Sequence, residues 1–411
     1  MRILILSQYC WPEVDHKCLP LAKAVFDAGH EVEILTSYPN RPTGKLYPGY
    51  KMRVKYSEYI EGIKVNRVPS YLDHSHSGLK RMISYLTFAF TASFIGVFLI
   101  RRPDVIYAYH APATIAIPAI FLKFIYRSKI FYDINDFWPD TISALGMLKN
   151  KFLLKVLAAY CKATYHFFDV INVVSKGYKK KLLELGVAEK KISLIYNWSL
   201  PIDNQKSALF QKYKSIFDSN FIFLYAGNIG QAQSLGIIIE AAMKLRSNGN
   251  SGIKFFIAGA GVEAAVLQKQ VIQDGLEEYI YFTGFIPSEN VGEFLEAADV
   301  LLLHLKSEPL FDITIPSKLV SYFICSKPVL CGVSGESTEI VENAGAGLCF
   351  QPEHPQDLYN KVLDLIKLDK ATLDSMGRAG REVYDNSFSF EKGTTLMIDE
   401  FSKLVGEYKS V

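Results

Sequence analysis

The sequence predicts an α/β protein made of two doubly wound domains. Its 411 residues exceed what a single ordinary core holds, and the composition (49% hydrophobic, 21% charged) is globular. Short apolar runs rich in β-branched residues recur in both halves, as parallel strands buried on both faces require. Longer stretches with helical periodicity separate these runs, so the order is strand then helix, repeated in each half.

Seven strands are expected in the first half: Ile3–Ser7, Glu31–Thr36, Ile63–Val68, Val105–Ala108, Lys129–Asp133, Val170–Val174 and Ile192–Ile195. The helical stretches between them include Pro20–Ala28, Leu79–Ile100 and Lys151–Phe168. Five strands are expected in the second half: Phe221–Ala226, Lys254–Ala258, Ile280–Thr283, Val300–Leu303 and Pro328–Cys331. Helices such as Ser234–Ser247 and Ala264–Asp274 separate these strands.

The domain boundary is expected in Asn197–Ser207, a polar stretch that contains a proline. The first domain then covers residues 1–200 and the second covers 201–385. A last helix, Phe390–Val405, follows a polar break, and residues 386–411 are expected to pack back on the first domain. Because ligands of doubly wound sheets bind beyond the carboxyl ends of the strands, we expect the active site in a cleft where the two domains face each other.

Charge is distributed unevenly along the chain. Residues 1–200 hold 27 Lys and Arg against 15 Asp and Glu (+12), whereas the remainder holds 18 against 27 (−9). This asymmetry indicates an anionic partner for the first half, with nucleic acid and an anionic membrane as the two candidates. The chain has no zinc-finger spacing and no aromatic–basic RNA motif, so we expect no nucleic acid.

The six cysteines show no C-x-x-C spacing. Their scatter disfavours a structural zinc site and a disulfide framework, and it favours a reducing compartment. The first ten residues lack the basic region and the long apolar core of a signal peptide and are interpreted as a first buried strand.

One segment favours the membrane. Tyr85–Ile100 carries no charge and is flanked by two basic pairs, Lys80-Arg81 and Arg101-Arg102. A spanning helix needs about 20 apolar residues, so we expect an interfacial helix whose basic flanks lie on anionic headgroups. Leu79–Arg102 is therefore the predicted membrane contact, and a helix buried against a sheet is the alternative.

The most informative motif is residues 311–332, where a polar loop leads through Pro316 into a helix. A proline at the first helical turn costs little, and the free N–H groups there favour a phosphate. Thr314 and Ser317 add hydroxyl donors, and Lys318 adds a full positive charge. These features predict a diphosphate site, with a capped surface helix as the alternative.

Two glycine-rich turns follow strands of the second half. In residues 226–233, two glycines allow a ligand to approach the backbone, and Asn228 and Gln233 offer amides. Residues 259–264 match G-x-G-x-x-A, but on the second strand of the domain rather than the first, so we interpret them as a tight turn near the ligand. Neither a P-loop nor a D-x-D pair is present in the sequence, so no magnesium clamp is expected, and Lys318 and a helix dipole would neutralise the diphosphate.

Together these residues resemble the retaining glycosyltransferases of the GT-B fold, family 4. More narrowly, the chain is similar to the L-fucosamine (N-acetylfucosamine) transferases of bacterial O-antigen and capsule synthesis. The matching stretches are Leu6–Val14, Leu35–Tyr50, Asp133–Gly146, Tyr225–Leu235, Phe255–Gly261, Phe282–Pro287 and Ile315–Pro328.

The resemblance implies a nucleotide-sugar held by the second domain and an acceptor held by the first. Phe285 and Ile286 would border the base, and Gly259 and Gly261 would line the nucleotide. Asn228 and Gln233 would face the phosphates or the sugar. The diphosphate would bind at Thr314, Pro316, Ser317 and Lys318, and Glu339 would lie near the ribose or sugar. No metal and no further cofactor are implied.

The chain departs from the family at the two glutamates that usually precede the K-P-V strand. Ile313 and Ser321 occupy those positions, which leaves Asp312 and Glu339 as candidate carboxylates for the donor sugar. Gln233 stands where many members have a basic residue, and Lys318 is the candidate replacement for that charge.

The resemblance also implies same-face displacement, in which the leaving diphosphate takes the acceptor proton. Lys318, Asp136 and Asn135 are the candidate catalytic residues. Candidates for acceptor binding are His16, Arg41, Lys45 and His110.

The expected function is metal-independent transfer of a UDP-linked, N-acetylated sugar to a polyprenyl-diphosphate-linked glycan. The expected place is the cytoplasmic face of the bacterial inner membrane, in O-antigen or lipopolysaccharide and capsule synthesis. A nucleotide-sugar epimerase with the GT-B fold and a non-catalytic glycan-assembly subunit are the alternatives.

Overall fold

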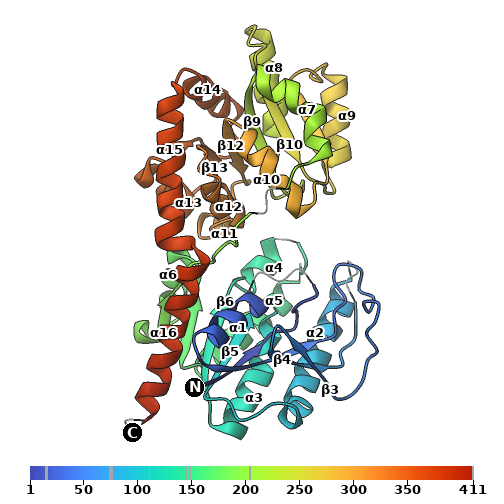
Figure 1. The fold of residues 1–411 in the computed structure, drawn as a ribbon, viewed down its shortest axis with the longest axis vertical. Coiled ribbons are helices and arrows are strands. Elements are labelled where there is room, and N and C mark those ends of the chain that lie inside the picture. Colours follow the sequence, from blue (N-terminus) through green and yellow to red (C-terminus); the bar gives the residue numbers. More distant parts are fainter. Residues whose placement is uncertain are drawn as a thin grey trace. The chain divides into compact units, whose positions relative to one another are not determined.

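The computed structural model describes residues 1–13, 17–73, 77–110, 112–144, 146–148, 150–202 and 205–409. The chain forms two compact units (Figure 1). The first comprises Met1–Asn197 with Glu391–Val411, and the second comprises Trp198–Phe390. The boundary therefore lies at residue 197, where residue 200 was expected, and the chain re-enters the first unit at residue 391.

The first unit is built on one eight-stranded sheet with the order β3-β4-β2-β1-β5-β6-β7-β8. Its strands are β1 (Arg2–Leu6), β2 (Glu31–Ser37), β3 (Tyr56–Ile60), β4 (Ile63–Val68), β5 (Val105–His110), β6 (Lys129–Ile134), β7 (Val170–Val173) and β8 (Ile192–Leu194). All neighbours pair in parallel except β3, which is antiparallel to β4. The sequence reading missed β3, although Glu61 and Gly62 both have positive φ and join β3 to β4 as a two-residue hairpin turn.

Helices cover this sheet: α1 (Cys18–Asp27), α2 (Gly78–Phe94), α3 (Ala116–Tyr126), α4 (Asp140–Ala144), α5 (Lys151–Tyr165) and α6 (Lys176–Glu184). The helix expected over Leu79–Ile100 is regular only to Phe94 and continues as a 3₁₀ turn at Gly96–Phe98. At Gly96 the backbone approaches β2 closely, since a Cβ there would lie 2.7 Å from Leu35 Cδ2. The last helix, α16 (Phe390–Lys409), runs beside the first unit (Figure 1), where the ring of Phe401 packs against Phe131.

The second unit has a parallel six-stranded sheet with the order β11-β10-β9-β12-β13-β14. Its strands are β9 (Phe221–Ala226), β10 (Ile253–Ala258), β11 (Ile280–Gly284), β12 (Val300–His304), β13 (Val329–Gly332) and β14 (Gly347–Cys349), of which only β14 was not expected. Its helices are α7 (Ala208–Ser219), α8 (Gly236–Ser247), α9 (Ala264–Gln273), α10 (Ser288–Ala297), α11 (Pro309–Asp312), α12 (Ser317–Ile324), α13 (Glu336–Ala344), α14 (Pro355–Ile366) and α15 (Lys370–Val383).

Each sheet changes its winding direction at one pair of strands. In the first unit this pair is β1 and β5, and in the second it is β9 and β12. Strand order reverses at such a pair, so the loops beyond its carboxyl ends diverge and leave a crevice where ligands bind. We therefore expect the functional residues of each unit at its crevice.

Candidate functional site

Backbone hydrogen bonds join the loops that follow β9, β10 and β11. The N–H of Gly227 donates to the carbonyl of Ala258 (2.8 Å), and the N–H of Gly259 donates to the carbonyl of Gly284 (2.9 Å). A Cβ on Gly259 would overlap the carbonyl of Gly227, and one on Gly261 would overlap the carbonyl of Ile229. The glycines predicted to line the nucleotide are thus required for the close packing of these loops.

Lys318 extends from the first turn of α12 across Gly227. A Cβ on Gly227 would overlap its Cε, and its Nζ lies 4.9 Å from the ring centroid of Tyr225. Burial lowers the pKa of Lys318 to about 8. Among the described residues no carboxylate pairs with this ammonium, so a half-buried cation stands at the crevice without an anion.

Tyr322, one turn further along α12, fixes the helix to the sheet. β9 and β12 pair only through Phe223–Val300 and Leu224–Leu301 and then separate. The Tyr322 hydroxyl accepts the N–H of Ala226 (3.0 Å) and donates to the carbonyl of Leu302 (3.2 Å). A buried side chain thereby satisfies backbone groups that the separating strands leave unpaired, and it sets the position of Lys318.

Asn228 and Gln233 lie together in the turn after β9. The Asn228 amide donates to Gln233 Oε1 (3.2 Å), which also accepts the N–H of Gly230 (3.1 Å). The side-chain oxygen of Gln233 therefore holds its own loop. Within the described part of the chain, no hydrogen bond uses the Gln233 NH₂ group or the side-chain oxygen of Asn228, so both can serve a ligand.

His304, at the end of β12, was not singled out in the sequence. Its Nε2 accepts the N–H of Glu353 (3.0 Å), so the ring proton is on Nδ1 and is donated to the carbonyl of Gln233 (2.8 Å). Burial lowers the pKa of His304, which keeps it in this neutral form. In the sequence, His304 could have been recognised as the polar residue that ends the otherwise apolar strand VLLLH.

The other donor-site candidates surround the start of α12. Pro316 is the N-cap of α12 rather than part of its first turn, because its ψ of 135° is extended. The hydroxyl of Thr314 donates to the carbonyl of Leu310 (2.8 Å), so its proton is already used, whereas Ser317 is exposed. Phe285 is exposed and Ile286 is buried after β11.

Two carboxylates approach this region from α11 and α13. A Cβ on Gly335, the N-cap of α13, would overlap the carbonyl of Asp312, so the two backbones are in contact. Glu339 lies in the first turn of α13, within the helix rather than in the preceding turn, and its side chain is exposed. Asp312 is therefore part of the backbone contact between α11 and the start of α13, and Glu339 lies one helical turn beyond that contact.

In the first unit, His110 ends β5 at the crevice. Its ring is fully buried and stacks on Tyr132 with centroids 5.2 Å apart, and among the described residues neither ring nitrogen has a hydrogen-bond partner. Burial lowers the pKa of His110 to about 3. His110 is therefore a neutral, buried polar group with unused hydrogen-bonding capacity.

Asp136 and Arg41 lie in each other's electrostatic field. Burial raises the pKa of Asp136, and the positive charge of Arg41 opposes that rise. Asn135 donates from Nδ2 to the carbonyl of Asp133 at 3.4 Å, and Lys45 is exposed. His16 lies outside the described residues.

A buried ion pair that the sequence reading missed underlies this region. Asp133 on β6 is fully buried and accepts from the hydroxyl of Tyr107 (2.6 Å) and the amide of Asn172 (2.6 Å). The Nζ of Lys17 lies 3.4 Å from Asp133 Oδ2 and donates to Asn197 Oδ1 (2.6 Å). This network ties the start of α1 to β6 and β7.

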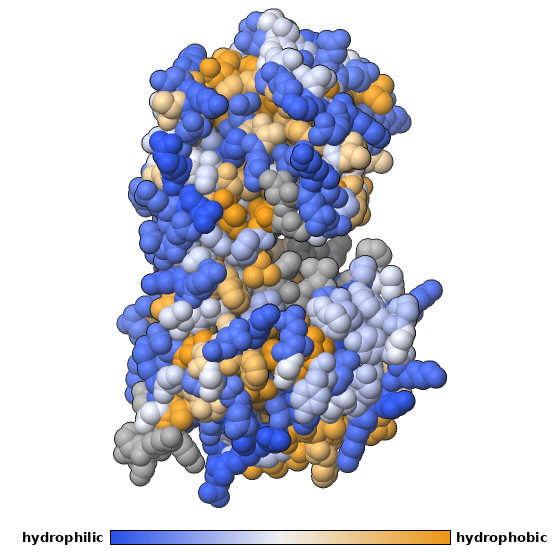
Figure 2. Space-filling view, in the orientation of Figure 1, coloured by the Kyte–Doolittle hydropathy of each residue, from blue (hydrophilic) through white to orange (hydrophobic). Residues whose placement is uncertain are grey.

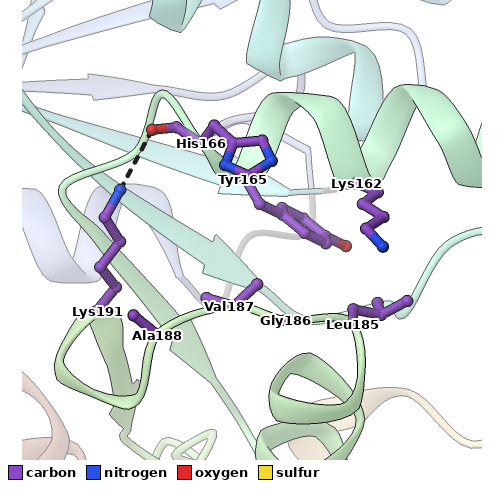
Figure 3. Close-up of a pocket in the computed structure, with 8 residues that line it drawn as sticks. All are labelled: Lys162, Tyr165, His166, Leu185, Gly186, Val187, Ala188 and Lys191. Atoms are coloured by element: carbon purple, nitrogen blue, oxygen red, sulfur yellow. Dashed lines mark hydrogen bonds between the residues drawn. The ribbon is translucent and has the colours of Figure 1, made fainter.

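A cavity of about 140 Å³ lies elsewhere in the first unit, before the amino ends of β7 and β8 (Figure 3). Lys191 spans one side and donates to the carbonyl of His166 (3.2 Å). Its full lining is Lys162, Tyr165, His166, Leu185, Gly186, Val187, Ala188 and Lys191. None of these lining residues was expected at the site. The cavity lies at the amino ends of the strands, whereas His110 lies at the carboxyl end of β5.

Within the described residues, no group of three or more His, Cys, Asp or Glu side chains is arranged to hold a metal ion.

Apolar side chains are exposed on α2 and α3. The most exposed rings of this region are Phe90 on α2 (63%), Phe98 in the 3₁₀ turn after α2 (73%) and Phe124 on α3 (66%). Phe94 packs α2 against α3, since its ring centroid lies 5.0 Å from that of Phe121. Figure 2 shows hydrophobic residues along the lower edge of the first unit, where α3 lies in Figure 1. By length and composition, Gly78–Phe98 is long and apolar enough to cross a membrane, and 33% of its most apolar 18-residue stretch is buried in the fold.

The comparisons with known proteins agree with this architecture. Residues 18–198 match the model "Glycosyltransferase Family 4", and residues 207–383 match "Glycosyl transferases group 1". A putative colanic acid biosynthesis glycosyl transferase, WcaI of Escherichia coli, is 26% identical over 83% of this chain and 86% of its own length. An amylovoran biosynthesis glycosyltransferase, AmsK of Erwinia amylovora, is 25% identical over 54% of this chain and 53% of its own.

Solved structures show the same fold. Anabaena HepE in complex with UDP superimposes with a TM-score of 0.69 at 16% identity, covering 98% of this chain and 100% of its own. A sucrose-phosphate synthase from Thermosynechococcus elongatus gives 0.71 at 15% identity over 99% of both chains. The chain therefore belongs to the glycosyltransferases of the GT-B fold, with a Family 4 domain followed by a group 1 domain, each Rossmann-like.

Proposed function

We propose that this protein transfers an N-acetylated sugar from a UDP-linked donor to a polyprenyl-diphosphate-linked glycan, with retention and without a metal ion. Its place would be the cytoplasmic face of a bacterial inner membrane, in the synthesis of a surface polysaccharide such as O-antigen or capsule. Relatives named for colanic acid and amylovoran synthesis support the polysaccharide, and UDP-bound neighbours of the same fold support the nucleotide.

The observation that carries the proposal is Lys318, a half-buried ammonium without a carboxylate partner among the described residues. It stands beside the backbone of Gly227 and the N-terminus of α12, whose N–H groups and dipole favour an anion. A donor diphosphate there would gain a charge-assisted hydrogen bond, and the negative charge that develops as it leaves would be stabilised in place.

In the proposed step, the acceptor oxygen forms a bond to the anomeric carbon while the bond from that carbon to the diphosphate oxygen breaks. Both events occur on one face of the sugar, so configuration is retained. The acceptor hydroxyl gives its proton to the departing diphosphate, which leaves as UDP. Lys318 stabilises the leaving group, and Asp136 and His110 would orient the acceptor in the first unit.

The apolar surface of α2 and α3 supports contact with a lipid bilayer. Exposed Phe90, Phe94 and Phe98 would enter the headgroup boundary, and Arg101 and Arg102 would lie on anionic headgroups. A bilayer would also present the polyprenyl acceptor to the first unit.

The test is donor turnover by purified full-length protein against UDP-, GDP- and dTDP-sugars with EDTA present. We expect hydrolysis and transfer from one UDP-sugar that collapses in Lys318→Ala and persists in Lys269→Ala, which removes an exposed charge from α9. Epimerised donor without transfer would support the epimerase instead. No binding or turnover of any donor would support a non-catalytic assembly subunit.

A further inference from the structure

Arg41 and Arg81, from distant segments of the chain, both lie near Tyr9, which is three residues beyond the end of β1. The guanidinium of Arg41 lies over the ring of Tyr9, 4.1 Å from its centroid. Both Arg41 and Arg81 lower the pKa of the Tyr9 hydroxyl, against the rise that burial causes, so both charges lie near it. Neither guanidinium forms an ion pair with a carboxylate within 4.0 Å among the described residues.

Arg81 is held in place by the start of α2. Ser77 caps this helix by accepting the N–H of Lys80, and Ser84, one turn after Arg81, accepts from the Gln8 amide at 3.2 Å. Since Gln8 directly precedes Tyr9, this bond fixes the first turns of α2 at the carboxyl end of β1. The Nε of Arg81 is nevertheless buried, and no hydrogen-bond partner for it exists in the part of the chain that the structure describes.

Other unsatisfied groups gather at the same crevice. In the described chain, seven buried side-chain atoms lack a partner, and six belong to residues that follow β1, end or follow β5, or begin α2. These are Gln8 Oε1, Glu13 Oε2, Arg81 Nε, both ring nitrogens of His110 and Thr114 Oγ1. Leaving buried polar groups unsatisfied is costly, so their concentration at the carboxyl ends of β1 and β5 indicates a polar ligand. Arg81 Nε, the Thr114 hydroxyl and one nitrogen of the neutral His110 ring can donate to such a ligand, whereas Gln8 Oε1 and Glu13 Oε2 can only accept.

We propose that Arg41 and Arg81 together bind the diphosphate of a lipid-linked acceptor at the carboxyl end of β1. This inference rests on the proposed function and adds Arg81 and Tyr9 to its acceptor site. Guanidinium groups suit phosphate oxygens because they donate in pairs, and Tyr9 holds Arg41 at the crevice in advance.

The same helix also carries the apolar surface proposed to contact the bilayer. From Arg81, α2 runs 13 residues to Phe94, about 20 Å at 1.5 Å per residue, and it exposes Leu86, Phe90 and Phe94. At 3.6 residues per turn these three side chains lie on the face of α2 opposite Arg81. One helix would thus present a phosphate-binding arginine to the crevice and, on its other face, an apolar surface to the bilayer.

The test uses farnesyl diphosphate, a short lipid diphosphate without a sugar, and measures its binding to the full chain by calorimetry. Lys318→Ala serves as the background, so that the probe cannot report the donor site. We expect binding that weakens about tenfold or more in Arg81→Ala and in Arg41→Ala, and less in Arg81→Lys. Lys190→Ala, which removes an exposed charge near the opposite edge of the sheet, should bind as the background does.

Two outcomes would overturn the inference. One is absent binding, or binding that both alanine variants retain although each unfolds at the background's temperature. The other is retained binding of farnesyl diphosphate with lost sedimentation on phosphatidylglycerol vesicles, which would assign the arginines to phospholipid headgroups. Donor hydrolysis by the wild type is measured separately, so failure of the arginine site and failure of the transferase proposal are distinguishable.

Discussion

Gly227 and Lys318 occupy adjoining space, because a Cβ on Gly227 would overlap the Cε of Lys318. The two residues are 91 positions apart and meet only because α12 packs against the end of β9. The lysine side chain lies over Gly227, which has no side chain of its own, and its ammonium is therefore held beside the turn that follows β9. Any side chain at residue 227 would displace the charge proposed to bind the donor.

Gly227→Ala should therefore weaken donor binding about as much as Lys318→Ala does, while the fold survives. The overlapping atom is near the end of a flexible side chain, so the lysine can move aside, and the remaining cost is the backbone strain of a φ of 145°. Donor affinity is measured by calorimetry, with Gly252→Ala, which meets nothing within 4 Å, as the control. If the affinity losses of Gly227→Ala and Lys318→Ala add fully in the double variant, the two residues act independently and the explanation is wrong.

Donor affinity should decrease as pH rises through about 8. Burial lowers the pKa of Lys318 from 10.5 to about 8, so the ammonium is charged below that pH and neutral above it. A bound diphosphate favours the charged form, so binding near pH 8 should take up protons. Calorimetry in buffers of different ionisation enthalpy measures this uptake, and Lys318→Arg should remove both effects. An unchanged affinity from about pH 7 to about pH 9 would contradict the assignment.

Tyr322→Phe should destabilise the protein by about 1–3 kcal/mol and weaken donor binding. The substitution removes one hydroxyl and leaves the N–H of Ala226 and the carbonyl of Leu302 buried without partners. Denaturant unfolding measures the first effect, and calorimetry with the donor measures the second. Tyr281→Phe, whose hydroxyl makes only an exposed bond, should change neither quantity.

His110→Leu should leave the free energy of unfolding undiminished but impair transfer to the acceptor. The imidazole has no hydrogen-bond partner among the described residues, so replacing it with an apolar side chain of similar size removes an unsatisfied buried group. The KM for the acceptor should rise while donor hydrolysis is retained. A large loss of stability would mean that the imidazole has a structural role instead.

Removing exposed aromatic rings from α2 and α3 should reduce sedimentation with anionic vesicles. Phe94→Ser and Phe124→Ser each delete an exposed ring from this surface, and neither residue lies in the second unit. Donor hydrolysis in detergent should be unchanged. Val266→Ser is the control, because it changes an apolar position on α9 that is at least as exposed (67%) as Phe94 (50%) and Phe124 (66%). Equal sedimentation of all three variants would remove the proposed membrane surface.

Much of the fold could be predicted because strand-forming runs carry a local signal. Twelve of the fourteen strands were expected close to their observed positions, since apolar β-branched runs bounded by helical periodicity are visible residue by residue. The two missed strands, β3 and β14, lie at sheet edges. β3 has the half-buried alternation YSEYI and β14 has only three residues, so neither shows the continuous apolar run used as the criterion.

Local sequence signals predicted only part of the candidate site. Lys318, Gly259 and Gly261 were singled out because each lies in a motif with local chemistry. Tyr322, His304, Arg81 and Asp133 were not, because their roles come from partners far away in the chain. Tyr322 reads as one more apolar position of an amphipathic helix until α12 is placed over the gap where β9 and β12 separate.

The sequence by itself determined the alternation of strands and helices, the two Rossmann-like domains and the residues whose chemistry suits a diphosphate. Periodicity, turn residues and helix-start motifs are properties of neighbours in the chain, and they survive without a fold. Only the tertiary structure decided that Lys318 lies on Gly227 and that Arg41 lies over Tyr9 with the charge of Arg81 nearby. It also left the His110 ring nitrogens without a hydrogen-bond partner among the described residues. Burial and charge proximity arise when distant segments pack together, and they convert ordinary side chains into a site.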